Sequence, residues 1–427
     1  MLLKRNKTDS NPSNIVRGKI SYGWVVTIAG AFIIFIAGNF QSSFGVYIQP
    51  LINRFGWSRA AISACVSTRT IMSGLASPVA GILSDRYGPR IFILIGIFLV
   101  GLGYLLSPLI DNLWQLYLFL GALTGIGIAA FLIPIVATVT RWFGIKSALA
   151  NGIISSGFGW AQVIVPPIAT YLILQHGWEM CLIVMGIAAL LLGTLAWSFI
   201  RTPPVMVKES AVQHEEGDTP EASKTQTGTE DSYTLSQALR TPTLWIMFLI
   251  VMVASSGYYM GVIHIVAAAI DTGMTPEAAA ITLTLCGITN TLGRLALGGL
   301  ATKIGNRTVL MLCLATEVLS LSLLARADSL YAFYIIAVIH GLGYGGVPPI
   351  IPTLTGSFFG TRALGSIIGS VNTAYMLGGA IGPFLAGYVF DVTGSYYTAF
   401  FYAAIVMIMA LLLCLLLRPP RRKDLLR

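Results

Sequence analysis

Long apolar runs recur along almost the whole chain, separated by short segments that contain glycine, proline or charged residues. Each run holds about 20 residues or more, the length that an α-helix needs to cross about 30 Å of hydrocarbon. The pattern therefore predicts an all-α membrane protein with twelve transmembrane helices. We expect them at residues 20–46, 57–82, 91–108, 114–140, 147–174, 179–200, 242–269, 277–301, 308–325, 331–355, 363–388 and 397–417.

Residues 201–240 break this pattern. The segment is polar, acidic and poor in aromatic residues, so it cannot bury a hydrophobic core of its own. We interpret it as a flexible cytoplasmic linker between two six-helix bundles. The expected units are an N-terminal tail, an N-terminal bundle, the linker, a C-terminal bundle and a C-terminal tail, at residues 1–19, 20–200, 201–240, 241–417 and 418–427.

The two halves resemble each other in sequence. GILSDRYGPR from Gly81 aligns with GGLATKIGNR from Gly298, and GIGIAAFLIPIV from Gly125 aligns with GLGYGGVPPIIP from Gly341. One six-helix unit has therefore been used twice, which predicts two pseudo-symmetric bundles. Parallel repeats of this kind place a binding site near the bilayer midplane between the halves, and they allow one half to rock against the other.

The basic residues predict the orientation of these helices. Lysine and arginine near helix ends are retained on the cytoplasmic side of a membrane. Of the 26 such residues, only Arg54, Arg59 and Arg326 fall in predicted outer loops, while Arg69 and Arg294 fall inside helices. Both termini are therefore expected in the cytoplasm. A basic inner face beside anionic lipid also accounts for the net charge of +9 without a nucleic-acid partner.

The loop after the second predicted helix carries a recognisable motif, GILSDRYGPR. Its glycines suit a tight turn, and its carboxylate can pair with a basic group at a neighbouring helix end, for which Arg141 is the candidate. The motif resembles the loop signature of the major facilitator superfamily, although the second copy has Thr302 where the acid would stand. The resemblance implies that fold and a gating role for the motif. The matching positions are Gly81, Leu83, Asp85, Arg86, Gly88 and Arg90.

Three further stretches narrow the resemblance to the monocarboxylate and oxalate/formate carrier branch. They are FGWSRAAISACVS in the second predicted helix, ISSGFGWAQVIVPPIATYLI in the fifth, and NTLGRLALGG in the eighth. The resemblance implies a secondary active transporter of a small organic carboxylate, which works by alternating access. It also implies that the arginine of the eighth helix, Arg294, contacts the substrate carboxylate.

Physical chemistry leads to the same arginine. An arginine near the middle of a span costs about 2.5–3.5 kcal/mol on insertion scales, so it should face a cavity or a partner. A planar, permanently charged guanidinium suits a carboxylate through two parallel hydrogen bonds. The alternative is that Arg294 extends its charge to the inner membrane surface. Arg69, nearer the centre of its helix, is a second anion ligand, a gate or a structural arginine.

Other polar groups at predicted mid-depth gather in the second half. Asn290 lies four residues before Arg294, and His340 lies four residues before Tyr344, so each pair shares a helix face. Tyrosine and asparagine can donate hydrogen bonds to a carboxylate, but each can equally bond a neighbouring helix. The candidate substrate contacts are Arg294, Arg69, Asn290, Tyr344, His340, Tyr375, Tyr258 and Tyr259.

Coupling to protons is the open question of the sequence. Animal relatives in the monocarboxylate branch have an acid one turn before the arginine and a lysine in the first helix, whereas this chain has Asn290 and no lysine between Tyr22 and Pro50. The candidates that remain for proton coupling are His264, His340 and Glu317. Proton symport and anion exchange both stay open.

Several other functions are disfavoured. The five cysteines lie in apolar runs without metal-ligand spacing, and neither a nucleotide-binding loop nor a Ser/His/Asp arrangement is evident. We therefore expect no enzyme activity, no metal and no cofactor. Two alternatives to the anion carrier are a multidrug or other small-molecule exporter and a non-transporting receptor on a carrier fold. The expected protein is a multi-pass monomer of the cell membrane, the inner membrane if it is bacterial.

Overall fold

The computed structural model describes residues 12–203 and 232–420, which are almost entirely helical and contain no β-strand within those ranges. The twelve ranges predicted from the apolar runs are helical over nearly all of their length. In chain order the elements are α1 (Pro12–Phe55), α2 (Arg59–Tyr87), α3 (Pro89–Leu105), η1 (Ser107–Leu109), α4 (Leu113–Leu116), η2 (Tyr117–Leu123), α5 (Thr124–Phe143), η3 (Gly144–Lys146), α6 (Ser147–Ser198), α7 (Leu235–Leu239), α8 (Pro242–Asp271), α9 (Pro276–Ile304), α10 (Asn306–Leu324), α11 (Leu330–Gly345), α12 (Val347–Phe359), α13 (Leu364–Thr393) and α14 (Tyr396–Leu416).

Glycines set several of the helix boundaries. Gly88 ends α2 with φ 92° and ψ 149°, and Gly305 ends α9 with φ 92° and ψ 144°. Such positive φ values favour glycine, which has no Cβ to clash with the backbone. Because these residues occupy corresponding places in the two sequence repeats, the repeats also share a backbone conformation. Gly177, with φ 88°, breaks α6 between its two predicted helices.

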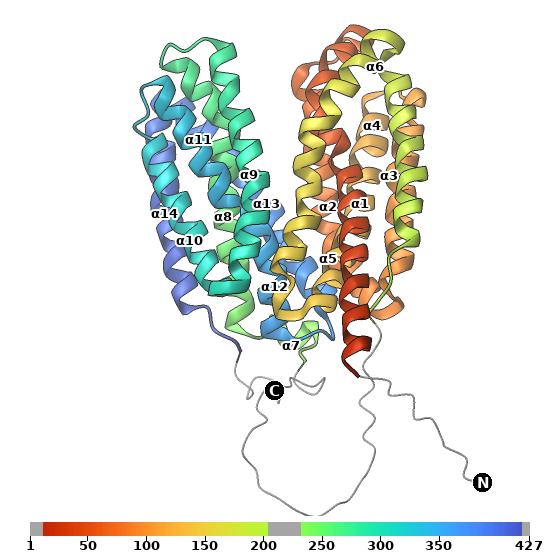
Figure 1. The fold of residues 1–427 in the computed structure, drawn as a ribbon. Helices are drawn as coiled ribbons and strands as arrows, with labels where there is room; N and C mark the ends of the chain where they lie inside the picture. Colours follow the sequence, from red (N-terminus) through yellow and green to blue (C-terminus); the bar gives the residue numbers. More distant parts are fainter. Residues whose placement is uncertain (1–11, 204–231, 421–427) are drawn as a thin grey trace, which may run out of the picture.

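The helices form two groups, one from α1 to α6 and one from α8 to α14 (Figure 1). Each group has its own apolar core, with Phe131 fully buried in the first and Phe333 and Phe400 buried in the second. Many large apolar side chains instead lie on the outside, including Leu174 at 76% exposure and Phe384 at 72%. An apolar exterior of this extent suits lipid as the surrounding solvent.

Seven segments of the described chain are long and apolar enough to cross a membrane. One of them covers 86 residues, which is several times the length of a single crossing. The segments are Leu113–Ser198, Pro242–Asp271, Ala278–Ile304, Asn306–Leu324, Leu330–Phe359, Leu364–Thr393 and Tyr396–Leu416.

The C-terminal part of the predicted linker is folded. Thr234 caps the short helix α7 by accepting a hydrogen bond from the Gln237 amide, and Tyr233 is buried against Phe359. The Tyr233 amide also donates to the Phe359 carbonyl at 2.9 Å. The prediction of a flexible linker therefore fails for residues 232–240, since Tyr233 supplies an apolar anchor. Residues 204–231 of the predicted linker lie outside the described part of the chain.

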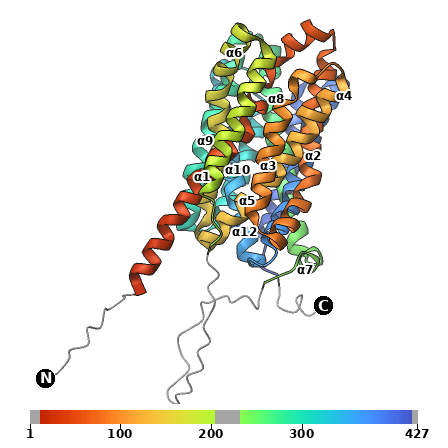
Figure 2. The ribbon, with the colours of Figure 1, turned by 90° about the vertical axis from the view of Figure 1, so that its right-hand side faces the viewer.

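We call the end of the molecule that holds α7 the α7 end. The two groups approach each other there and diverge toward the opposite end (Figure 1). Viewed from the side of the first group, α2, α3 and α6 lie in front of α9, α10 and α12 (Figure 2). The most extensive contacts between the groups are those of α2 with α13 and of α6 with α9, and we call these the two interfaces; α12 also contacts α5 and α6, and α5 contacts α13.

Candidate functional site

Arg294 lies on α9 at the interface with α6. Its Nε donates to Oδ1 of Asn290, one turn earlier, at 3.0 Å, and its Nη1 donates to the Ser155 carbonyl of α6 at 2.9 Å. The Asn290 side chain is only 5% exposed, and its Nδ2 donates to the Gly341 carbonyl of α11 at 3.4 Å. The guanidinium is therefore held by its own helix and bridges the two groups, while remaining partly accessible.

Four tyrosines gather near this guanidinium. The rings of Tyr258 and Tyr344 are stacked, with centroids 3.9 Å apart, and the hydroxyls of Tyr259 and Tyr375 lie 2.6 Å apart. The charge of Arg294 acts on Tyr258, Tyr259 and Tyr344, which shows that the guanidinium is near them. We call this set the Arg294 cluster; its members are Arg294, Asn290, Tyr258, Tyr259, Tyr344 and Tyr375.

The Arg294 cluster carries a positive charge with no acidic partner among the described residues. The two pairings of basic with acidic side chains found there are Arg141 with Asp85 and His340 with Glu317. The Tyr344 hydroxyl is buried and has no hydrogen-bond partner within the same residues. A fixed guanidinium beside phenol donors is suited to a carboxylate, which would neutralise the charge and accept the hydrogen bonds.

The remaining substrate candidates lie apart from these contacts. His340 is 1% exposed and sits behind Tyr258, with its ring stacked on the Tyr258 ring at 5.3 Å between centroids. Arg69 is 4% exposed and lies in the first group, where Cys65 and Tyr104 are its electrostatic neighbours. The described contacts of Arg294 do not include Arg69. The structure therefore unites six of the eight predicted contacts and places the other two elsewhere.

The three candidates for proton coupling separate into two places. Nε2 of His264 lies 3.0 Å from the Pro383 carbonyl, and Nδ1 lies 3.2 Å from the Tyr396 hydroxyl. Because a carbonyl only accepts, Nε2 carries the hydrogen and Nδ1 accepts from the tyrosine. Both ring nitrogens of His264 therefore have a partner, and the ring joins α8 to α13 and α14. His340 and Glu317, by contrast, contact each other at 3.0 Å.

Asp85 joins the two groups at the α7 end. Its Oδ1 accepts hydrogen bonds from Arg141 at 2.6 Å and from the Gly365 amide at 3.0 Å. Its Oδ2 accepts from the amide and the hydroxyl of Ser366, both at 2.8 Å. The carboxylate therefore binds the N-terminus of α13, where the helix dipole favours negative charge. Arg141 also donates to the Thr361 carbonyl, so it bridges the groups as well.

The other motif residues play local parts. The Arg86 guanidinium lies over the Tyr87 ring, and Arg90 lies over the Trp197 ring at 4.9 Å from its centroid. Gly88 supplies the turn, and a Cβ added at Gly81 would collide with the Gly365 carbonyl of α13. Gly81 thus permits close helix contact, and Asp85 alone among the charged residues of the motif has described hydrogen bonds to the other group.

Sequence reasoning missed the partners supplied by backbone. The Ser155 carbonyl, the Thr361 carbonyl and the amides of Gly365 and Ser366 complete these contacts. A sequence pattern cannot predict which backbone carbonyl or amide will form such a contact, because almost every residue carries both groups. The small residues of SGFG and ALGS, which allow helices to approach, were the available signal.

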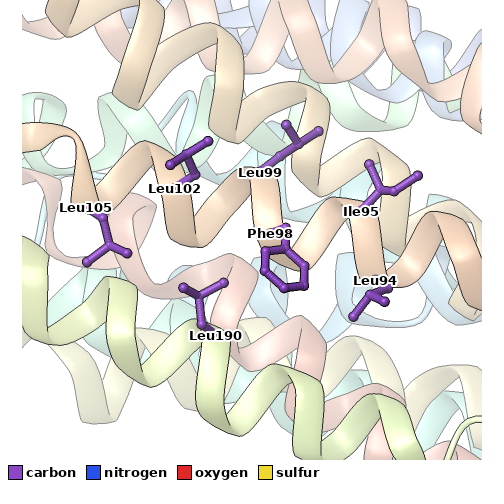
Figure 3. A pocket seen from close by; sticks show the side chains of 7 residues that line it. All are labelled: Leu94, Ile95, Phe98, Leu99, Leu102, Leu105 and Leu190. Atoms are coloured by element: carbon purple, nitrogen blue, oxygen red, sulfur yellow. The ribbon is translucent and has the colours of Figure 1, made fainter.

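A groove between α3 and α6 offers no such chemistry. All of its lining side chains are apolar, so it cannot hold a carboxylate (Figure 3). Ile95 and Phe98 are exposed on the outside of the first group, which suits contact with lipid. The lining residues are Leu94, Ile95, Phe98, Leu99, Leu102, Leu105 and Leu190.

Two helical groups with an apolar exterior and the Arg294 cluster at their interface define a membrane carrier. The chain belongs to the Major Facilitator Superfamily, whose family model matches residues 30–270 and 253–427. The predictions of this superfamily and of a carrier without enzyme activity are confirmed.

Curated relatives support the narrower resemblance. The chain is 27% identical over 381 residues to monocarboxylate transporter 13 of Rattus norvegicus, covering 89% of this chain and 85% of the relative. It is 25% identical to monocarboxylate transporter 12 of Mus musculus, covering 89% and 82%, and 25% identical to monocarboxylate transporter 11 of Homo sapiens, covering 89% and 79%. The predicted resemblance to monocarboxylate carriers is therefore confirmed.

Solved structures support the fold. The crystal structure of the transporter FucP in the outward conformation superposes with a TM-score of 0.71 at 16% identity, covering 92% of this chain and 98% of FucP. The human organic anion transporter MFSD10 (TETRAN) gives a TM-score of 0.66 at 14% identity, covering 95% and 100%. At these identities the likeness shows the fold alone.

Proposed function

We propose that this protein is a secondary active transporter of a small organic carboxylate and that Arg294 is its substrate anchor. The observation that carries the proposal is a guanidinium at the interface of the two groups without an acidic partner in the described residues. A charge that lies between two apolar helical groups is stabilised by an opposite charge beside it. A substrate carboxylate balances the charge and accepts hydrogen bonds from the surrounding tyrosines. The relatives named as monocarboxylate transporters support the same class.

A monocarboxylate fits the cluster better than a dicarboxylate. The Arg294 cluster contributes one guanidinium, and Arg69 has its described neighbours in the other group. One cation balances one carboxylate, so lactate, pyruvate or formate suits the site. Oxalate would need a second cation, which Arg69 supplies only if it turns toward the cluster in another state.

Transport by alternating access requires a defined orientation. We propose twelve membrane spans with both termini and the α7 end in the cytoplasm, because lysine and arginine concentrate in the loops at that end. On this assignment, the contacts of Asp85 close the cytoplasmic side, and the structure represents an outward-facing state. We assign Asp85 and Arg141 the role of holding the cytoplasmic side closed.

The exporter alternative is less well supported by the geometry. A carrier of lipophilic cations needs an accessible carboxylate in its cavity. Glu317 is 0% exposed and paired with His340, so it is not available to a cation in the state described here. A receptor that binds an anion without moving it would share the Arg294 cluster, and flux separates it from a carrier.

The test is uptake into proteoliposomes of labelled lactate, pyruvate, formate and oxalate, each assayed with and without an inward proton gradient. Arg294→Gln keeps a polar side chain but removes the charge, and we expect uptake to fall at least about tenfold, as for loss of a charge-assisted bond. Arg326→Gln, at an exposed arginine, is the matched control and should retain uptake.

Each outcome of this test has a definite meaning. Uptake of one anion that disappears in Arg294→Gln and survives in Arg326→Gln supports the proposal. Binding of an anion without flux indicates a receptor, and competition by lipophilic cations instead of anions indicates an exporter. Equal uptake by wild type and Arg294→Gln contradicts the role of Arg294.

A further inference from the structure

Glu317 and His340 form a buried acid–base pair behind the Arg294 cluster. Glu317 lies on α10 and is 0% exposed, and His340 lies on α11 and is 1% exposed. Oε2 of the carboxyl is 3.0 Å from Nδ1 of the imidazole. Neither carboxyl oxygen receives a well-aligned hydrogen bond from the part of the chain that the structure describes. The neighbouring imidazole is therefore the natural partner for a proton on this carboxyl.

The hydrogen-bond partners of His340 fix how many protons the pair can hold. Nε2 lies 3.1 Å from the Tyr258 carbonyl, which only accepts, so Nε2 carries a hydrogen. Nδ1 lies between Glu317 and the Ser320 hydroxyl, which is 2.9 Å away. One further proton between Nδ1 and Oε2 makes the pair neutral, whether it resides on nitrogen or on oxygen. Without that proton the pair carries one negative charge.

The described surroundings of the pair supply no cation in direct contact with it. The titratable groups described around the pair are phenols and thiols, and none of them is a lysine or an arginine. They are Tyr258 of α8, Cys286 of α9, Cys313 of α10 and Tyr344 of α11. Tyr258 and Tyr344 are also the residues on which the charge of Arg294 acts. A net charge is costly in such an apolar setting unless an opposite charge is near. Arg294 is the cation that lies across the tyrosine stack.

We propose that the Glu317–His340 pair is the proton-binding site that couples transport to a proton gradient. The proposal rests on the proposed function, because it requires a carboxylate substrate at Arg294. When Arg294 is empty, its charge favours the ionised form of the pair from across the tyrosine stack, although Arg294 and Glu317 do not touch. When the substrate carboxylate occupies Arg294, the pair takes one proton from water. That proton returns to water when the substrate leaves on the other side, so one anion and one proton cross together.

Tyr258 gives the two sites a physical connection. Its ring stacks on Tyr344 within the Arg294 cluster and also on the His340 ring, while its carbonyl accepts from His340. Gly261, one turn further along α8, lies directly against the imidazole, so a shift of α8 would change the packing around His340. Movement of α8 during transport would therefore alter both sites together.

The first experiment separates exchange from accumulation in proteoliposomes. Glu317→Gln keeps the size of the side chain but cannot bind or release a proton. We expect this variant to retain exchange of labelled for unlabelled substrate. Its accumulation of substrate driven by a proton gradient should fall at least about tenfold, which is within the usual range of coupling between two sites. His340→Gln should behave alike, and Asp391→Asn, at an exposed acid of α13, should match wild type. Gradient-driven accumulation by Glu317→Gln at the wild-type level overturns the proposal.

A second measurement needs no substrate. Infrared difference spectra are recorded between about pH 6 and about pH 8, a range in which surface carboxyls do not change protonation. We expect a carboxylate or protonated-carboxyl difference band in wild type and in Asp391→Asn that is absent from Glu317→Gln and altered in His340→Gln, because the carboxylate band shifts even when the proton resides on nitrogen. A band that persists in Glu317→Gln, or no band in folded wild type, overturns the proposal. If wild type moves none of the four anions, the proposed function fails, and this band alone decides the proposal for the pair.

Discussion

The two interfaces between the helical groups have the same backbone design but different chemistry. At the α2–α13 interface Gly81 packs against the Gly365 carbonyl, and at the α6–α9 interface Gly298 packs against the Ala148 carbonyl. These are corresponding positions of the two repeats. The first interface carries Asp85, which binds the start of α13, whereas the second has Thr302, whose hydroxyl donates within its own helix to Gly299.

Deeper in the molecule, the charged residue lies at the α6–α9 interface and the neutral residue lies at the α2–α13 interface. Arg294 corresponds to Ser77 in the first repeat, and Ser155 corresponds to Asn372 in the second. Arg294 bonds the Ser155 carbonyl, and Asn372 donates to the Ser77 hydroxyl at 2.9 Å. The same cross-interface contact is thus charged at the α6–α9 interface and neutral at the other. The duplicated unit gave the two interfaces a similar backbone. Sequence divergence then placed the ionic contact of the α7 end at the α2–α13 interface and the candidate substrate anchor at the α6–α9 interface.

Gly81→Val tests whether the α2–α13 interface must close fully, and it should have the largest effect. The new side chain would meet the Gly365 carbonyl and the Ser366 backbone, which cannot rotate away as a side chain could. We expect uptake to fall to background while the protein still folds within the membrane. Gly387→Val on α13 is the control, since a Cβ there meets nothing within 4 Å. Wild-type uptake by Gly81→Val would show that the close contact at the α2–α13 interface is dispensable.

Asp85→Asn should have the next largest effect, because it removes the charge from the α7 end while keeping the side-chain shape. Hydrogen bonds to a charged group contribute about 1.5–3 kcal/mol each, so the state described here should lose at least about tenfold in population. A cysteine introduced by Thr353→Cys, at a position buried in this state, should then react faster with a maleimide.

The native cysteines are suitable background for this measurement, since all five are buried. The control is Asp391→Asn in the same Thr353→Cys protein, which should label at the rate of the parent. Unchanged labelling in Asp85→Asn would show that the contacts of Asp85 do not hold the α7 end closed.

Thr302→Asp should have the smallest effect and should make the two interfaces more alike. Thr302 is exposed on α9, whose neighbouring Gly298 packs against the start of α6. A carboxylate near a helix N-terminus contributes about 0.3–1 kcal/mol, and Ser357 stands where Arg141 stands in the first repeat. We expect labelling at Thr353→Cys to slow about two- to fivefold, as that free energy implies. Faster labelling would show that the added charge opens the α7 end.

The positions of the helices could be predicted because each membrane helix requires a continuous apolar segment of the sequence. A run of about 20 apolar residues is needed to satisfy every backbone group in hydrocarbon, so the run itself marks the helix. The boundaries were less accurate where other forces acted. The helix α1 extends from Pro12 to Phe55, beyond its apolar run, and Gly346 divides one predicted helix into α11 and α12.

The site could be predicted in part for a related reason. Arg294 stood out because a charge in an apolar run needs an explanation, and Asn290 followed from helical spacing. The contact between Asp85 and Arg141 is present in the structure, while the roles assigned to these residues stay predictions. The pairing of Glu317 with His340 could not be read from spacing, because the residues lie on different helices.

The residue pattern alone was enough to predict a helical, duplicated membrane carrier and to single out Arg294 as a candidate for anion binding. Those properties depend on local composition, periodicity and repetition, which a linear chain records. Only the tertiary structure decided which polar groups share a place. It brought Tyr258, Tyr259 and Tyr344 toward Arg294, kept His264 apart, and set Glu317 against His340. The physical reason is that hydrogen bonds and charge pairs act over a few ångströms in space, whatever separates their residues along the chain.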